Sequence, residues 1–165
     1  MRIMLFKKYF SSAYFYHLIL FISFSISLNN LIELEYINLF FYVFAHLIII
    51  YLCFYYFHFF FYFVLFLYGI FFDILLLNNI GPHLLVFIFL PVIISFLKKY
   101  LFNLSSMKIF YIIITLMFLI FLFEMILADI ILNYNFDYSK YIQLCIIGLI
   151  IVFPVFFLFS KIDRL

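Results

Sequence analysis

The sequence predicts an all-α membrane protein with six transmembrane helices in one bundle, and three observations lead to this prediction. Hydrophobic residues make up 72% of the chain and charged residues 10%, and the mean hydropathy is +1.40. The apolar residues form runs long enough to cross the hydrocarbon core of a bilayer, which takes about 20 residues of helix. Lysine and arginine mark several of the segments between these runs. This composition is that of an integral membrane protein.

Four of the helices are visible directly as separate apolar runs, at about 13–28, 82–97, 109–131 and 141–159. Between the first two, the stretch 37–77 is about twice as long as one crossing requires, since a helix rises about 1.5 Å per residue through about 30 Å of hydrocarbon. No strongly polar turn divides this stretch. Its length therefore predicts two helices. The positions of the basic residues on either side of the stretch test this prediction.

The basic residues place the helices relative to the two sides of the membrane. They gather before residue 9 and again between residues 98 and 108, and the positive-inside rule puts both groups in the cytoplasm. The chain must then cross an even number of times between the two groups, which requires two helices at about 37–54 and 59–77. The two basic groups consist of Arg2, Lys7, Lys8, Lys98, Lys99 and Lys108.

The same rule orients the rest of the chain. Two later crossings return Lys161 and Arg164 to the cytoplasm, so both termini are expected there. The turn between the second and third helices would also be cytoplasmic, with Tyr55, Tyr56 and Tyr62 as anchors at the membrane interface. Residues 1–165 are therefore expected to form a single polytopic membrane domain.

Asp73 is the most informative residue, because a carboxylate inside an apolar run is costly. At bilayer depth it costs about 2.5–3.5 kcal/mol, so such a residue normally faces a bundle interior or a polar cavity. Gly69 lies one helical turn earlier on the same face, where it would let another backbone approach closely. Gly81 and Pro82 follow and are expected to end this helix and start the next. The pattern predicts a buried acid near a helix end, beside a tight turn.

The spacing Gly-x3-Asp-x7-Gly, followed by a further apolar helix, resembles the central signature of the rod shape-determining protein MreD family. The general plan of the chain is also similar to that of the family. It has the length, the short basic N-terminus, and a last helix that contains Pro154 before a basic tail. The chain departs from the family pattern at residues 54–59, where a proline and basic residues are expected and aromatic residues predominate.

The resemblance implies a non-catalytic scaffold in the bacterial inner membrane, a component of the cell-elongation machinery that sets rod shape. Such a protein would bind an MreC-like single-pass membrane protein and help to organise sidewall peptidoglycan synthesis. Through that partner it would reach an MreB-like actin and the peptidoglycan synthases. The fold implied is similar to that of the substrate-capture subunit of energy-coupling-factor transporters.

Two other functions fit a small six-helix membrane protein. A small-molecule-binding subunit of an energy-coupling-factor-type vitamin transporter would have a polar external pocket and a small-residue face toward the cytoplasmic side of its first helix. Here Ser23 and Ser27 lie toward the external end instead. A core subunit of a respiratory complex would show a glycine-rich broken helix, which the sequence lacks. The identity of the neighbouring genes would separate these alternatives.

Four polar residues within or next to the apolar runs are candidates for one cluster in the outer half of the membrane. Counting along the helices places Asp73 about four residues, and His46 about eight residues, from the external ends of their helices. Glu124 lies about fifteen residues into its own helix, and His83 directly follows the turn at Gly81. An open pocket, an acid–base relay and purely structural hydrogen bonding all fit this placement.

Catalysis, metal binding and nucleic-acid binding find no support in the sequence. It contains no nucleophile–base–orienter set, no phosphate-binding glycine loop and no His/Cys spacing typical of metal sites. Cys53 and Cys145 lie alone in apolar runs and are interpreted as buried thiols. The basic residues are sparse and flank the membrane. We therefore expect no enzyme activity and no cofactor. The expected partners are the lipid bilayer and other proteins, and not nucleic acid.

The parity of the basic segments makes the topology testable by cysteine labelling. In a variant with Cys53 and Cys145 replaced by serine, single cysteines at positions 34 and 136 should react with an impermeant thiol reagent in intact cells. A cysteine at position 57 should react only after the membrane is opened, and one in the loop 99–108 is the matched cytoplasmic control. External labelling at position 57 or in that loop would contradict six crossings.

Overall fold

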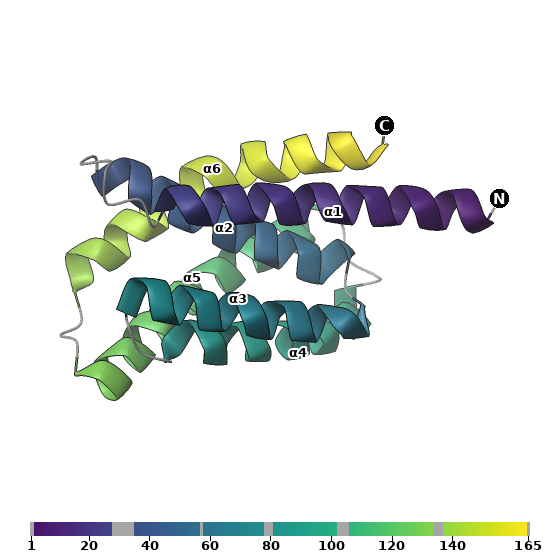
Figure 1. Cartoon of the computed structure of the whole chain (residues 1–165). Coiled ribbons are helices and arrows are strands. Elements are labelled where there is room, and N and C mark those ends of the chain that lie inside the picture. Colours follow the sequence, from purple (N-terminus) through teal and green to yellow (C-terminus); the bar gives the residue numbers. More distant parts are fainter. Residues whose placement is uncertain are drawn as a thin grey trace. The chain divides into compact units, whose positions relative to one another are not determined.

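The computed structural model describes residues 2–27, 35–56, 58–77, 81–101, 106–133 and 137–164. All the regular secondary structure in these residues is α-helical. Six helices occupy these ranges (Figure 1). The all-α prediction is confirmed, and each helix overlaps one of the six ranges predicted from hydropathy and charge. In chain order the helices are α1 (Arg2–Ser27), α2 (Glu35–Tyr55), α3 (Phe59–Leu77), α4 (Pro82–Leu101), α5 (Ser106–Leu132) and α6 (Tyr138–Arg164).

The structure differs from the six-helix prediction in how many helices meet the requirements of a membrane span. Within the described ranges, three segments are long and apolar enough to cross a membrane, and they belong to α2, α5 and α6. The apolar stretches of α1, α3 and α4 are shorter. The three longer segments are Glu35–Tyr55, Lys108–Leu132 and Tyr138–Asp163; the shorter ones are Ala13–Ser27, Phe61–Leu75 and Pro82–Lys98.

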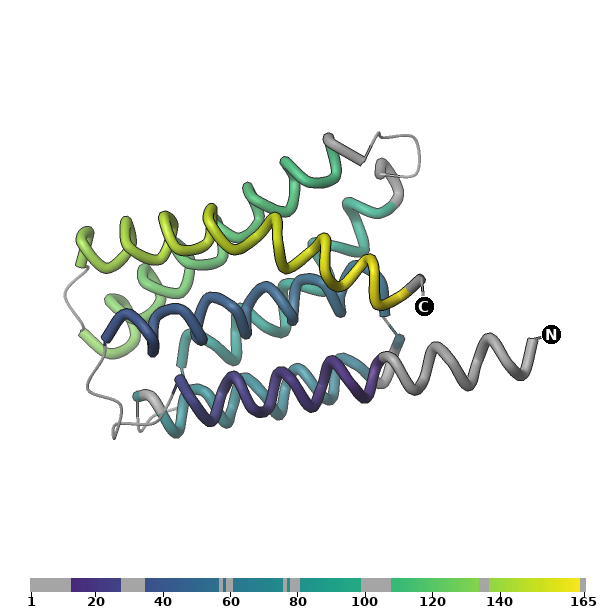
Figure 2. The backbone as a smooth tube through the Cα atoms, turned by 90° about the horizontal axis from the view of Figure 1, so that it is seen from above, coloured from purple at the N-terminus to yellow at the C-terminus, as the bar shows by residue number. Residues whose placement is uncertain are grey.

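The chain divides into two compact units, and the first comprises residues 1–56 and 147–165. It contains α1, α2 and most of α6. Helices α1 and α2 pack along each other in opposite directions (Figure 2). Helix α2 supplies most of the core, because every residue from Ala45 to Phe54 is buried. A helix that is apolar on all sides is one that other elements surround.

The second unit comprises residues 57–146, with α3, α4, α5 and the first turns of α6. Helix α4 packs against both α3 and α5. The antiparallel α3–α4 pair can be followed in Figure 1. Phe72 and Phe87 meet between these two helices with ring centroids 5.6 Å apart and ring planes at 82°, the edge-to-face arrangement that aromatic pairs favour. Whether the two units form the single predicted domain stays a prediction.

Local chemistry explains two helix boundaries of the second unit. Helix α6 begins after Asp137, whose Oδ1 accepts the backbone N–H groups of Ser139 and Lys140 at 2.9 and 3.2 Å, as an N-cap residue does. Helix α5 ends at Leu132, and Asn133 follows with a φ of 53°. This left-handed conformation is common just after a helix, and asparagine tolerates it better than most residues.

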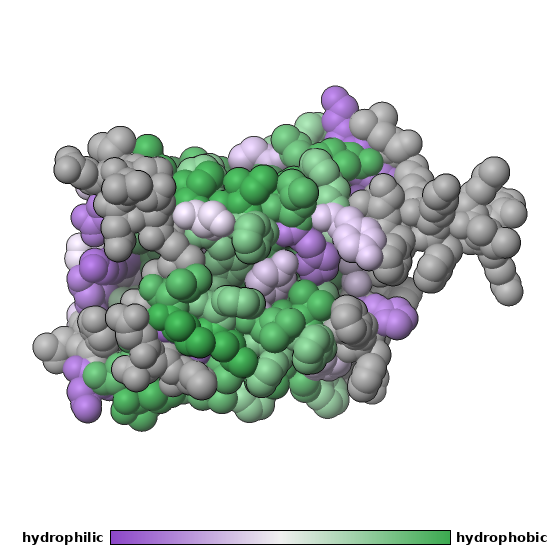
Figure 3. All heavy atoms as spheres, in the orientation of Figure 1, coloured by the Kyte–Doolittle hydropathy of each residue, from purple (hydrophilic) through white to green (hydrophobic). Residues whose placement is uncertain are grey.

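Large apolar side chains lie on the outside of both units. Hydrophobic residues cover much of the coloured surface visible in Figure 3. Extended apolar surface of this kind is rare on proteins that face water, and lipid is the medium in which it has no cost. The most exposed large side chains include Phe21 in α1, Phe71 in α3, Ile130 in α5, and Ile150 and Phe153 in α6.

Candidate functional site

Asp73 lies in the last turns of α3 with its side chain completely buried. Its Oδ2 atom accepts the backbone N–H groups of Gly81 at 2.8 Å and Leu84 at 3.0 Å. Its Oδ1 atom accepts the backbone N–H of His83 at 3.0 Å and lies 2.8 Å from the Nδ1 atom of the same residue. A carboxylate has about four acceptor positions, and here all four are used.

These contacts make Asp73 the cap of the following helix. The first backbone N–H groups of a helix have no partner within the helix and normally bond to a side chain just before it. At α4 that position is Gly81, which has no side chain, and the first helical residue, Pro82, has no N–H to satisfy. Asp73 reaches across from α3 instead, and its negative charge suits the positive end of the α4 dipole.

His83 supplies the fourth donor to Asp73. Its ring is buried against Phe72, with centroids 5.2 Å apart, so its orientation is held on one side by packing and on the other by the carboxylate. When Nδ1 carries the ring proton, it donates to Oδ1 of Asp73, and this bond favours that tautomer. Asp73 and His83 therefore act as one unit at the α3–α4 turn.

At Gly69 the backbones of α3 and α4 lie close together. A Cβ atom at this position would lie 2.6 Å from Cα of Leu84, which is closer than real Cβ atoms come to a neighbouring atom, and 3.1 Å from its N. Only glycine permits such an approach. Leu84 is also the residue whose N–H bonds to Asp73. Gly69 and Asp73, one turn apart on α3, therefore hold the same residue of α4.

Gly81 and Pro154 have different roles from Gly69. At Gly81 a Cβ atom would meet only methyl groups of Ile131 and Leu132, at 4.0 Å, and its φ is not positive. Its contribution is the N–H that Asp73 accepts, which any residue except proline would provide. Pro154 lies inside α6, in the part of that helix that belongs to the first unit.

The predicted polar cluster is brought together in part. Asp73 and His83 are in contact, as described above. Glu124 is buried in α5, within the same unit as that pair. His46 belongs to the other unit, where its ring packs on Tyr42 and its Nδ1 atom lies 2.9 Å from the carbonyl oxygen of Tyr42. A single cluster of all four residues stays a prediction.

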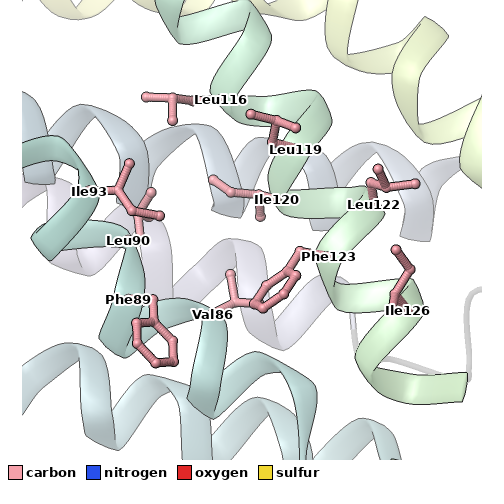
Figure 4. Close-up of a pocket in the computed structure, with 10 residues that line it drawn as sticks. All are labelled: Val86, Phe89, Leu90, Ile93, Leu116, Leu119, Ile120, Leu122, Phe123 and Ile126. Carbon is pink, nitrogen blue, oxygen red and sulfur yellow. The ribbon is translucent and has the colours of Figure 1, made fainter. Parts of the chain in front are cut away.

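A groove between α4 and α5 is a hollow of the second unit (Figure 4). It encloses about 420 Å³, and all its lining residues are apolar. A site for a polar small molecule needs a few polar groups to orient it, and this groove offers none. The part of the chain that the structure describes also contains no group of three His, Cys, Asp or Glu residues placed to hold a metal ion. The groove is lined by Val86, Phe89, Leu90, Ile93, Leu116, Leu119, Ile120, Leu122, Phe123 and Ile126.

Sequence reasoning missed a second carboxylate site, which lies in the first unit. Asp163, near the end of α6, accepts hydrogen bonds from the hydroxyl groups of Tyr16, Tyr51 and Tyr56. Tyr56 was expected to be an interface anchor, but its side chain turns inward and is 9% exposed, whereas that of Tyr55 is 51% exposed. The one available signal was Asp163 itself, an acid at the end of an apolar helix, because no sequence spacing links it to the tyrosines.

No family model, curated protein or solved structure matches this chain. The features of the described residues that bear on function are the two carboxylate sites, the apolar groove and the apolar exterior. The resemblance to MreD rests on the three residues of the Gly-x3-Asp-x7-Gly motif. The structure describes all three: Gly69 and Asp73 lie in α3, and Gly81 directly precedes α4.

The two glycines of the motif form a matched pair for mutation. Gly69→Ala should destabilise the protein by about 1–3 kcal/mol, because its Cβ would overlap the backbone of Leu84, and Gly69→Leu should be worse. Gly81→Ala should stay within about 0.5 kcal/mol of wild type, because its Cβ has room. Thermal unfolding of the purified protein in detergent measures both. Wild-type behaviour of Gly69→Leu would contradict the close approach of α3 and α4.

Proposed function

We propose that this protein is a non-catalytic membrane scaffold of the MreD type, acting in the bacterial inner membrane as part of the cell-elongation machinery. The observation that supports this most directly is the use made of Asp73. All four acceptor positions of this buried acid are engaged in joining α3 to α4, and none is directed at a ligand. The signature residue therefore has a complete structural explanation.

The proposed topology has six crossings with the basic ends of α1 and α6 in the cytoplasm. Helices α1, α3 and α4 have shorter apolar stretches, but their full lengths are 26, 19 and 20 residues. At 1.5 Å per residue they measure about 28 to 39 Å, close to or above the hydrocarbon thickness of about 30 Å. Lysine and arginine at helix ends reach the interface by extending their side chains, which adds to the usable length.

The proposed partner is an MreC-like single-pass membrane protein, which would connect the scaffold to an MreB-like actin and to the peptidoglycan synthases. Helices associate in lipid through close packing of complementary surfaces, so a scaffold needs a surface of fixed shape. The Gly69–Leu84 approach and the Asp73 cap fix α3 and α4 relative to each other. The apolar exterior of both units offers faces on which a partner helix can pack.

The alternative, a vitamin-binding transporter subunit, predicts a polar external pocket. The groove between α4 and α5 has apolar walls, so it does not favour that reading. The two functions differ in what they require of Asp73. A scaffold requires the hydrogen bonds of this residue, whereas a ligand or proton site requires its charge.

Two substitutions of Asp73 separate these requirements. Asp73→Leu should be severe, because it leaves four buried donors without an acceptor, each at a cost of about 1–3 kcal/mol. Asp73→Asn keeps one acceptor oxygen and should be milder. In both variants, loss of rod shape should follow the loss of protein or of the MreC-like partner in a pull-down.

The contrary result is equally clear. An Asp73→Asn protein that accumulates normally, retains the partner and yet fails to restore rod shape would show that the charge itself is needed. That outcome would replace the scaffold with a ligand or proton site. Gly81→Ala, which alters the same turn without removing an acceptor, is the control in each assay.

A further inference from the structure

Asp163 joins three segments of the first unit at one end of that unit. Its Oδ1 atom accepts hydrogen bonds from two hydroxyl groups. One is that of Tyr16 in α1, at 2.7 Å, and the other is that of Tyr56, which directly follows α2. Its Oδ2 atom accepts the hydroxyl of Tyr51 from α2. Hydrogen bonds to an ionised acceptor are about twice as strong as those between neutral groups. The carboxylate therefore ties the end of α6 to both of the other helices.

The rings of the tyrosines add packing to these bonds. Tyr16 and Tyr51 lie with centroids 5.3 Å apart, and both contact the ring of Phe159, one turn before Asp163. The hydroxyl of Tyr16 also lies 3.2 Å from the carbonyl oxygen of Phe159. Tyr16 and Tyr51 are almost completely buried, whereas Asp163 is half-buried. The acid is therefore the outermost member of the group.

Pro154 weakens α6 nine residues before Asp163. A proline inside a helix has no N–H for the carbonyl four residues earlier, and its ring crowds that carbonyl. The turn around Ile150 therefore lacks one hydrogen bond. The segment 155–164 is joined to the rest of α6 by this weakened turn and to α1 and α2 by the group around Asp163.

We propose that residues 155–164 form a hinged strap, with Pro154 as the hinge and Asp163 as the latch. With the latch closed, the strap holds α1 and α2 together at this end of the unit. Movement of Asp163 away from the tyrosines releases all three segments at once, because a single carboxylate accepts all three bonds. This device lies outside the α3–α4 motif and does not depend on the proposed scaffold function.

Distance measurements between spin labels test the latch. Labels on cysteines at positions 18 and 161, both exposed in the first unit, would report the separation of α1 and the strap, with Cys53 and Cys145 replaced by serine. The protein with Asp163 should give one narrow distribution. Asp163→Leu should add a longer population, with the released-to-latched ratio rising about tenfold for each hydrogen bond removed.

A graded series keeps the test informative where one variant fails to fold. Tyr51→Phe removes one donor and retains the ring, so it should have the smallest effect, and Asp163→Asn should lie between it and Asp163→Leu. Asp137→Asn removes an acid at the other end of α6 and should leave the distances unchanged. If both Asp163 variants gave the same distance distribution as the wild-type protein, the latch would be overturned.

The hinge has its own test. Pro154→Ala should restore the missing helix hydrogen bond and stiffen the strap. Combined with Asp163→Leu, it should reduce the longer population, because the strap would then follow the axis of the helix. Pro154 is exposed, so alanine leaves no cavity. A longer population that is the same with and without Pro154 would remove the hinge from the proposal.

Discussion

The rest of the structure depends on one constraint, which is that a carboxylate buried among apolar helices must have all its acceptor positions filled. Water is not there to fill them, and an unsatisfied charge in such surroundings costs several kcal/mol. Asp73 meets the constraint with three backbone N–H groups and one ring nitrogen, all from residues 81–84. The bonds that satisfy the acid are the bonds that position α4, so burial of the charge and the geometry of the α3–α4 pair cannot be separated.

Asp163 is half-buried, and its oxygens are engaged by other means. Its donors are the side chains of Tyr16, Tyr51 and Tyr56, which come from segments more than a hundred residues away in the chain. Backbone donors at a helix start are present wherever a helix begins, whereas phenol donors must be delivered by tertiary packing. The Asp73 site therefore orders a local turn, whereas the Asp163 site joins the two sequence segments, 1–56 and 147–165, that make up the first unit.

The two acids together bear on what kind of protein this is. In each, the carboxylate oxygens are engaged with donors from the chain itself, and the groove between α4 and α5 has no polar wall. Charged and polar groups are used to hold helices together, and the outside is left apolar. These features support a protein that acts through the shape of its surface in the membrane, which is the basis of the scaffold proposal.

The sequence by itself determined the helices and the importance of one turn. Apolar runs, together with the parity of the basic segments, predicted six helices, and each predicted range overlaps a helix of the structure. Gly69, Asp73 and Pro82 indicated the importance of the α3–α4 connection, because glycine, acidic residues and proline are uncommon inside an apolar run. Only the tertiary structure decided which residues satisfy Asp73, that Gly69 must be glycine while Gly81 need not be, and that Tyr56 faces Asp163 rather than the interface. The physical reason is that local sequence carries hydropathy and helix-end chemistry, whereas the partner of a buried polar group is set by which distant segments pack beside it.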